Sequence, residues 1–150
     1  PNLTEALVLL YGKEKMKTVW KEFQTITGQE RLERIEETGR KLAEEFSLSA
    51  VVITGVDQQE EGETVKMGNL VLENGKCSWV FAEKAGGSYS GTGDIFASIL
   101  SAGLVKGYSM EACADMAVDF ISASIRDAVK EGTDRNDGVC FELHLGRLVR

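Results

Sequence analysis

The stretch SYSGTGDIFAS, residues 88–98, decides the fold and also indicates a site. Gly91, Thr92, Gly93 and Asp94 stand directly before an apolar run that predicts a buried helix over 94–105. The first N–H groups of a helix have no partner within the helix, and the helix dipole adds positive potential there. Glycine lets the backbone approach a ligand that a Cβ would obstruct. The stretch therefore predicts an anion site, for which phosphate is the common occupant.

Asp94 follows the glycines at once, and it cannot be a partner of the phosphate because both groups are anionic. It can instead face an acceptor hydroxyl and take its proton as a phosphoryl group is transferred. A second interpretation stays open, in which the glycines make a tight turn and Asp94 caps the helix. Short glycine motifs also arise by chance, so these four residues alone do not decide between the two.

Asn2 and Glu5 stand three residues apart in the opening segment PNLTEA, so they share one face of a helical turn. An amide and a carboxylate placed in this way can hold water molecules around Mg²⁺, which takes few protein ligands in phosphoryl-transfer sites. The same pair forms a capping box, and the two residues alone favour that interpretation. Because the chain opens without Met and directly in a motif, we expect it to be a piece of a longer protein.

Hydrophobic spacing predicts the helices. Besides 94–105, they are expected over residues 4–10, 13–26, 29–46 and 110–132. The first of these is expected to end near Gly12. Gly39 lies on the apolar stripe of the 29–46 helix, where glycine costs helix propensity, so we expect close packing against a sheet there.

Strands are predicted between and after these helices. The run AVVIT, residues 50–54, predicts a strand that is buried on both faces and stops at Gly55, with a polar loop over 56–63. Two strands follow around Asn74–Gly75, a preferred two-residue type I′ hairpin turn. Residues 138–142, GVCFE, predict a last strand. The order of elements indicates an α/β protein, as one domain or part of one.

Composition excludes several classes of protein. The 150 residues are 43% hydrophobic and 27% charged, which is typical of a globular protein. A net charge of −7 disfavours a nucleic-acid partner, and no apolar run approaches the roughly 20 residues of a membrane span. The three cysteines are unpatterned and odd in number, which favours reduced thiols and a cytoplasmic location.

Other sites lack the parts they need. P-loop and protein-kinase motifs are absent, and His144 is the single histidine, which we expect at the surface or at a strand end. The aromatic residues Trp20, Trp79 and Phe96 are expected in the core. Asp134, Asn136 and Asp137 imitate a calcium loop, but Gly138 is misplaced for one, so these residues predict a turn.

Four segments occur together in the order PNLTEA, VVITG, SGTGDIFAS and DRNDGVCFE. In this order the chain resembles the pyridoxal, pyridoxine and pyridoxamine kinases of the ribokinase-like superfamily, over essentially all of its residues but only the C-terminal half of such a kinase. The resemblance implies one portion of a kinase domain over residues 1–150, with a mostly parallel central sheet, flanking helices and a β-hairpin. The N-terminal half, with the vitamin pocket and several strands, has no counterpart here.

The resemblance also implies roles for the GTGD residues. Asp94 corresponds to the catalytic base of the family. The N–H groups of Gly91, Thr92 and Gly93 correspond to its anion hole. Hydroxymethylpyrimidine kinases of the same superfamily usually carry Cys after G-T-G, so Asp94 favours the vitamin B6 branch.

ATP and Mg²⁺ are the cofactors that the resemblance implies. Asn2 and Glu5 would organise Mg²⁺, through water, together with the phosphates. Thr54 and Gly55 match a position that lines the nucleotide in relatives. We expect residues of the 110–130 segment to border the adenine.

The implied reaction is the ATP-dependent phosphorylation of the 5′-hydroxymethyl group of a vitamin B6 vitamer by the whole enzyme. Two alternatives stay open. One is a hydroxymethylpyrimidine or sugar kinase, and the other is a non-catalytic module that binds nucleotide or serves in assembly. We expect a homodimer, or self-association through a sheet edge beside residues 50–54.

Overall fold

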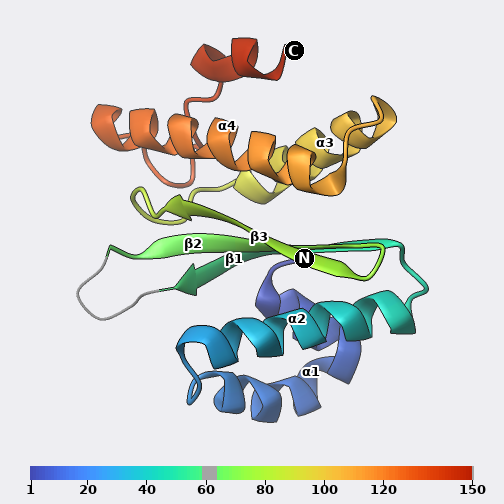
Figure 1. The fold of residues 1–150 in the computed structure, drawn as a ribbon. Coiled ribbons are helices and arrows are strands. Elements are labelled where there is room, and N and C mark those ends of the chain that lie inside the picture. Colours follow the sequence, from blue (N-terminus) through green and yellow to red (C-terminus); the bar gives the residue numbers. More distant parts are fainter. Residues whose placement is uncertain (59–63, 150) are drawn as a thin grey trace. The chain divides into compact units, whose positions relative to one another are not determined.

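The structure is a computed structural model that describes residues 1–58 and 64–149. The chain forms two compact units, Pro1–Phe81 and Ala82–Arg150. The first holds α1 (Leu3–Phe23), α2 (Gly28–Glu45), β1 (Ala50–Gln58), β2 (Lys66–Glu73) and β3 (Lys76–Glu83), which ends just inside the second (Figure 1). The second holds α3 (Thr92–Val105), α4 (Met110–Glu131) and a 3₁₀ helix, η1 (Glu142–Leu148). The α/β class is confirmed.

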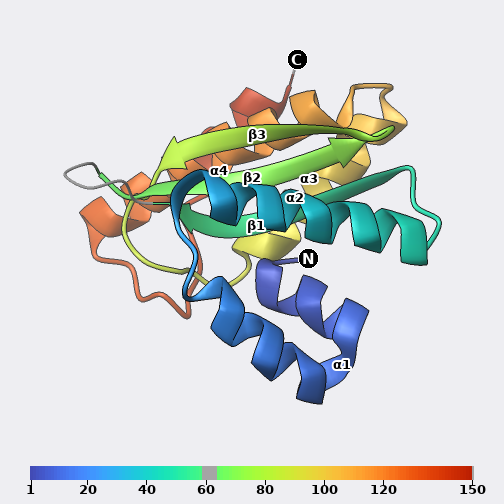
Figure 2. The ribbon, with the colours of Figure 1, turned by 60° about the horizontal axis from the view of Figure 1, so that its bottom comes forward.

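α1 is bent, because Gly12 inside it has a non-helical backbone with φ 72° and ψ 165°. The predicted end of the first helical segment near Gly12 is therefore confirmed, and Figure 2 shows the two arms. Glycine is suited to this position because a side chain is strained at such a φ.

Close packing of α2 on the sheet is confirmed at Gly39. A Cβ built there would lie 3.0 Å from Leu70 Cδ2 and 3.9 Å from Ile53 Cδ1, so glycine permits the approach. Residues from both helices and from β1 and β2 share the core of this unit. Its buried members are Leu3, Ala6, Leu7, Phe23, Ile35, Leu42, Val51, Ile53, Val56, Leu70 and Leu72. Trp20 and Trp79 were predicted in the core, and they pack against it but are only partly buried.

The sheet of the first unit has the strand order β1-β2-β3, and β1 pairs antiparallel with β2. Residues 59–65 alone separate the two strands, which suits an antiparallel pair, whereas a parallel crossover needs about a dozen residues or more. Besides these strand pairs, the described residues form an isolated parallel bridge between Asn2 and Thr54. The mostly parallel sheet implied by the resemblance is therefore not what these three strands form.

β1 continues beyond Gly55, so the predicted end of this strand is wrong. The backbone passes Gly55 through a bulge instead of a turn: Ile53 pairs with Leu70 and Val56 with Gly68, so Thr54 and Gly55 together oppose Asn69. Residues 56–58 of the predicted loop belong to the strand, and 59–63 lie outside the described residues. Burial of residues 51–53 on both faces of the strand is confirmed.

The hairpin turn is confirmed. Asn74 and Gly75 have φ values of 50° and 81°, and a type I′ turn requires positive φ at both central residues.

α3 and α4 pack against each other in the second unit (Figure 1). Phe96, Ile99 and Gly103 of α3 are buried, and Phe96 is in the core as predicted. Val105, however, is 90% exposed in this chain, so the predicted burial of this helix is only partly correct. α4 begins after the Ser109 cap and ends at Gly132, in close agreement with the predicted helix over 110–132.

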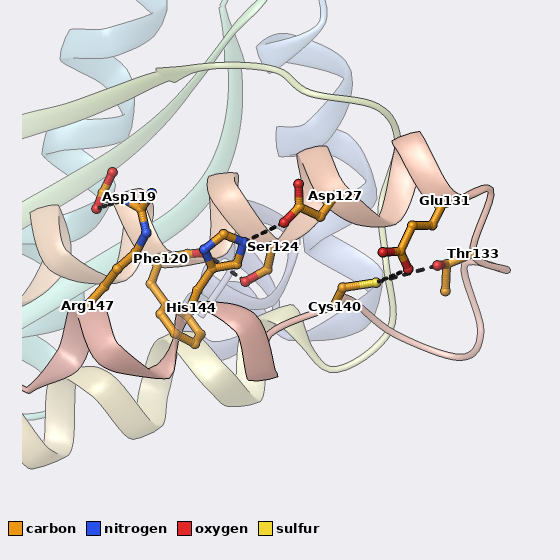
Figure 3. Close-up of polar contacts among 9 residues, drawn as sticks. All are labelled: Asp119, Phe120, Ser124, Asp127, Glu131, Thr133, Cys140, His144 and Arg147. Atoms are coloured by element: carbon orange, nitrogen blue, oxygen red, sulfur yellow. Dashed lines mark hydrogen bonds and ion pairs between the residues drawn. The ribbon is translucent and has the colours of Figure 1, made fainter.

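No strand forms over 138–142, where one was predicted. The Phe141 N–H donates to the Val139 carbonyl at 2.9 Å, a tight turn that an extended strand does not allow, and η1 begins at Glu142. Figure 3 shows η1 held on α4: His144 Nε2 lies 2.9 Å from Asp127 Oδ2. His144 is thus largely buried, not at the surface or a strand end as predicted.

The cysteines form no disulfide, as expected. Burial raises the pKa of the Cys77 thiol, so this group is a poor nucleophile at neutral pH. The 134–137 turn is also confirmed, because the Asn136 N–H donates to Asp134 Oδ1 at 2.8 Å. None of the described helices has the length and hydrophobicity needed to cross a membrane.

Candidate active site

The N-terminus of α1 is closed by its own side chains. Asn2 Oδ1 accepts a hydrogen bond from the Glu5 N–H at 2.9 Å, and Glu5 Oε2 accepts one from the Asn2 N–H at 2.8 Å. The capping-box interpretation is therefore confirmed. Both residues remain exposed, and Glu5 Oε1 has no hydrogen-bond partner in the described part of the chain. A role in holding the water shell of Mg²⁺ fits this exposed oxygen and stays a prediction.

The start of the chain lies beside the bulge of β1. The Thr54 N–H donates to the Pro1 carbonyl at 3.0 Å, and Asn2 and Thr54 form the parallel bridge. These contacts bring Asn2 and Thr54 together although they are far apart in the sequence. The Glu5 and Gly55 positions are therefore also brought to the same end of the sheet.

Asn69 is a residue that sequence reasoning missed at this end of the sheet. It is 5% exposed, and its Oδ1 accepts from the Gly55 N–H at 3.3 Å while its Nδ2 donates to the Val80 carbonyl at 3.4 Å. The amide thus satisfies a backbone donor that the bulge leaves outside the strand ladder. An available signal was the single amide inside the apolar run of KMGNLVLE.

The N-terminus of α3 is built differently. Gly91 is its N-cap, in the left-handed conformation with φ 80°, and no side chain caps the helix. The Thr92 hydroxyl donates to the Tyr89 carbonyl at 3.0 Å and so is turned back toward the preceding chain. Asp94 lies in the first turn, exposed, and its carboxylate makes no hydrogen bond to the described residues. The structure therefore does not support the alternative in which Asp94 caps the helix.

Space is open around both glycines of the motif. A Cβ at Gly91 or at Gly93 would meet no atom of the described residues within 4 Å. Gly91 is required by its positive φ, but Gly93 has no such φ. Packing among the described residues gives no reason for glycine at 93, and the open space leaves room for a ligand to approach the backbone there.

The predicted site residues fall into two groups. Asn2, Glu5, Thr54 and Gly55 lie in the first unit, and residues 91–94 lie in the second. No group of three or more His, Cys, Asp or Glu that could hold a metal ion occurs over residues 1–58 and 64–149. A metal held here would therefore depend on water and on groups outside these side chains, as Mg²⁺ commonly does.

A family model described as phosphomethylpyrimidine kinase matches residues 1–138. The chain belongs to this family. A comparison with curated proteins gave no match. Among solved structures, a proposed phosphomethylpyrimidine kinase from Bacteroides thetaiotaomicron VPI-5482 is similar at 26% identity, with a TM-score of 0.68, over 79% of this chain and 40% of that chain. An orthorhombic form of that protein with pyridoxal gives 27% identity and a TM-score of 0.69, over 79% of this chain and 41% of that one.

Pyridoxal kinases share the fold. That of Lactobacillus plantarum gives a TM-score of 0.64 at 23% identity, over 83% of this chain and 42% of that one. That of Bacillus subtilis, an ADP complex, gives a TM-score of 0.59 at 23% identity, over 84% of this chain and 41% of that one. The chain thus spans about two fifths of these proteins. The predicted ribokinase-like fold is confirmed, and the family is one of kinases.

Proposed function

We propose that this chain is the part of a vitamin B6 kinase that binds ATP and Mg²⁺ and supplies the catalytic base. The whole protein would phosphorylate the 5′-hydroxymethyl group of pyridoxal, pyridoxine or pyridoxamine. One observation carries the proposal: the exposed Asp94 carboxylate stands in the first turn of a helix whose N-terminus no side chain caps. Membership of a kinase family supports it.

In this reaction Asp94 and the first-turn N–H groups of α3 have different roles. Asp94 accepts the hydroxyl proton while the acceptor oxygen forms a bond to the γ-phosphorus and the bond from that phosphorus to the ADP oxygen breaks. The first-turn N–H groups, Gly93 among them, hold the negative charge of the phosphoryl group. Open space at Gly93 is what such an approach requires.

Asn2 and Glu5 would hold Mg²⁺ through water, and the ion would neutralise charge on the phosphates. Their capping box fixes the two side chains at the end of α1. Thr54, whose N–H donates to the Pro1 carbonyl, and the adjacent Gly55 would line the nucleotide. We expect this protein to act in the cytoplasm.

The second candidate is phosphorylation of a hydroxymethylpyrimidine, which the name of the matching family favours. Asp94 favours the vitamin B6 branch, as does the crystal form of a relative with pyridoxal. The test is the initial rate of the whole protein with MgATP and each acceptor in turn. Higher kcat/KM for pyridoxal supports the proposal, and higher kcat/KM for the pyrimidine overturns it in favour of the second candidate.

The 150-residue chain alone is expected to be nearly inactive. In-line positioning of donor and acceptor can be worth about 7–11 kcal/mol, and the residues assigned here concern the donor and the base. We also expect self-association through the edge of the sheet at β1. Formation of pyridoxal phosphate by the purified chain at about 1 s⁻¹, the low end of ordinary enzymes, would contradict this expectation.

A further inference from the structure

The segment that leads into the N-terminus of α3 is fixed by the loop after α4. The Ser90 N–H donates to the Arg135 carbonyl at 2.9 Å. Tyr89 and Val139 are buried in one cluster with Ala128 of α4. Two successive contacts therefore join the residues before Gly91 to the loop that carries Arg135.

The Arg135 guanidinium lies flat on Gly87. A Cβ built at Gly87 would be 2.5 Å from Cζ, 2.6 Å from Nη1 and 2.7 Å from Nη2. Nearly equal distances to three atoms of one plane place the face of the guanidinium over this position. Its N–H groups lie in that plane, so they are directed sideways and not at Gly87.

These donors have no acceptor in the described part of the chain. Arg135 is exposed and makes no side-chain hydrogen bond or ion pair there, whereas Arg34, Arg40 and Arg147 are each paired with a carboxylate. The neighbouring Asp134 is already engaged, because its Oδ1 accepts from the Asn136 N–H. An orientated but unpaired guanidinium is thus held next to the segment that precedes the GTGD residues.

We propose that Arg135 is a further phosphate-binding residue, whose guanidinium edge contacts the phosphate groups of a nucleotide held at the N-terminus of α3. A planar fork of donors matches the oxygens of a phosphate, and stacking on Gly87 fixes its orientation in advance. This inference rests on the proposed function, because it assigns a second element to the same nucleotide site.

The test measures the dissociation constants of MgATP and of adenosine for the whole protein and its Arg135→Ala variant. Loss of a charge-assisted contact of about 1.5–3 kcal/mol predicts a roughly 10- to 150-fold weaker affinity for MgATP. Affinity for adenosine, which has no phosphate, stays unchanged. Arg135→Lys recovers part of the loss. Arg40→Ala removes an exposed guanidinium of α2, to which no role in the site is assigned, and serves as the control, with no change expected.

Gly87→Ala provides an independent variant that keeps the arginine. Its backbone has no positive φ, so alanine is tolerated, but the new Cβ displaces the guanidinium. We expect the same loss of MgATP affinity, and no further loss when Gly87→Ala is combined with Arg135→Ala. Unchanged MgATP affinity in Arg135→Ala, or an equal loss for adenosine, overturns the inference while the kinase proposal stands. A wild-type protein that binds no MgATP overturns both.

Discussion

The N-termini of α1 and α3 meet the same physical need in opposite ways. Each helix leaves its first N–H groups without partners in the helix, and each carries a carboxylate at the third helical position, Glu5 or Asp94. In α1 the N-cap is Asn2, and the two side chains satisfy each other's backbone donors. In α3 the N-cap is Gly91, which has no side chain to offer. A single difference at the N-cap thus separates a closed helix end from an open one.

This difference teaches which carboxylate is free for chemistry. One oxygen of Glu5 is engaged in the capping box, so this carboxylate is partly committed to the fold. Asp94 has no hydrogen bond to the described residues and is exposed. An unengaged carboxylate beside uncapped amides is suited to accept a proton next to a bound phosphate.

Asp94→Asn in the whole protein should have the largest effect. The amide cannot accept the hydroxyl proton, so kcat should fall by on the order of 10²- to 10⁴-fold while the affinity for MgATP stays nearly constant. Steady-state kinetics and a binding titration measure the two quantities. A kcat equal to that of the wild type would mean that Asp94 is not the base.

Gly93→Val should weaken nucleotide binding more than folding. No atom of the described residues lies within 4 Å of a Cβ at this position, and the backbone has no positive φ, so the fold accommodates the side chain. The valine stands where the anion approaches, and loss of one contact to a charged group predicts a roughly 10- to 150-fold weaker affinity for MgATP. A large drop in Tm with unchanged affinity would show that glycine is there for the fold.

Asn2→Ala should lower the stability of the fold. It removes the side chain that caps α1, and such losses cost about 0.5–2 kcal/mol in the free energy of unfolding. Asn2→Asp keeps an acceptor at the N-cap and is the matched control, with a much smaller loss. Denaturant unfolding of both variants measures the difference. Equal stability of Asn2→Ala and wild type would show that the capping box does not stabilise the fold.

Glu5→Gln should have the smallest effect on stability. Glutamine can complete a capping box, so the free energy of unfolding should change by less than about 0.5 kcal/mol. The lost charge should nevertheless raise the Mg²⁺ concentration needed for half-maximal activity of the whole protein. If the Mg²⁺ dependence is unchanged as well, Glu5 serves the cap and has no part in holding the metal.

Residue patterns predicted the local elements well where one physical rule dominated. Positive φ at Gly12 and at Asn74–Gly75, and the packing of Gly39 on the sheet, follow from the special freedom and small size of glycine and from turn chemistry. The capping box of Asn2 and Glu5 also follows from its spacing. In these cases the necessary contacts lie close in sequence or depend on one residue type.

Prediction failed where pairing over distance decides the outcome. Gly55 was expected to end β1, but the strand continues through a bulge. The buried side chain of Asn69, on β2, accepts a hydrogen bond from the Gly55 N–H that the bulge leaves outside the strand ladder. The GVCFE segment has strand-like residues, yet a tight turn at Phe141 and the His144–Asp127 contact lead it onto α4 instead (Figure 3). Neither partner is adjacent in sequence, so local pattern could not supply it.

The central claim is that the open N-terminus of α3 binds phosphate. The most direct measurement is the change in the backbone amide NMR resonances of Gly91, Thr92, Gly93 and Asp94 in the whole protein on titration with MgATP, without acceptor, and, separately, with adenosine. We predict large changes at these amides with MgATP and none with adenosine, while the capped Glu5 amide shifts less. If MgATP binds and the resonances of residues 91–94 stay in place, the claim is contradicted.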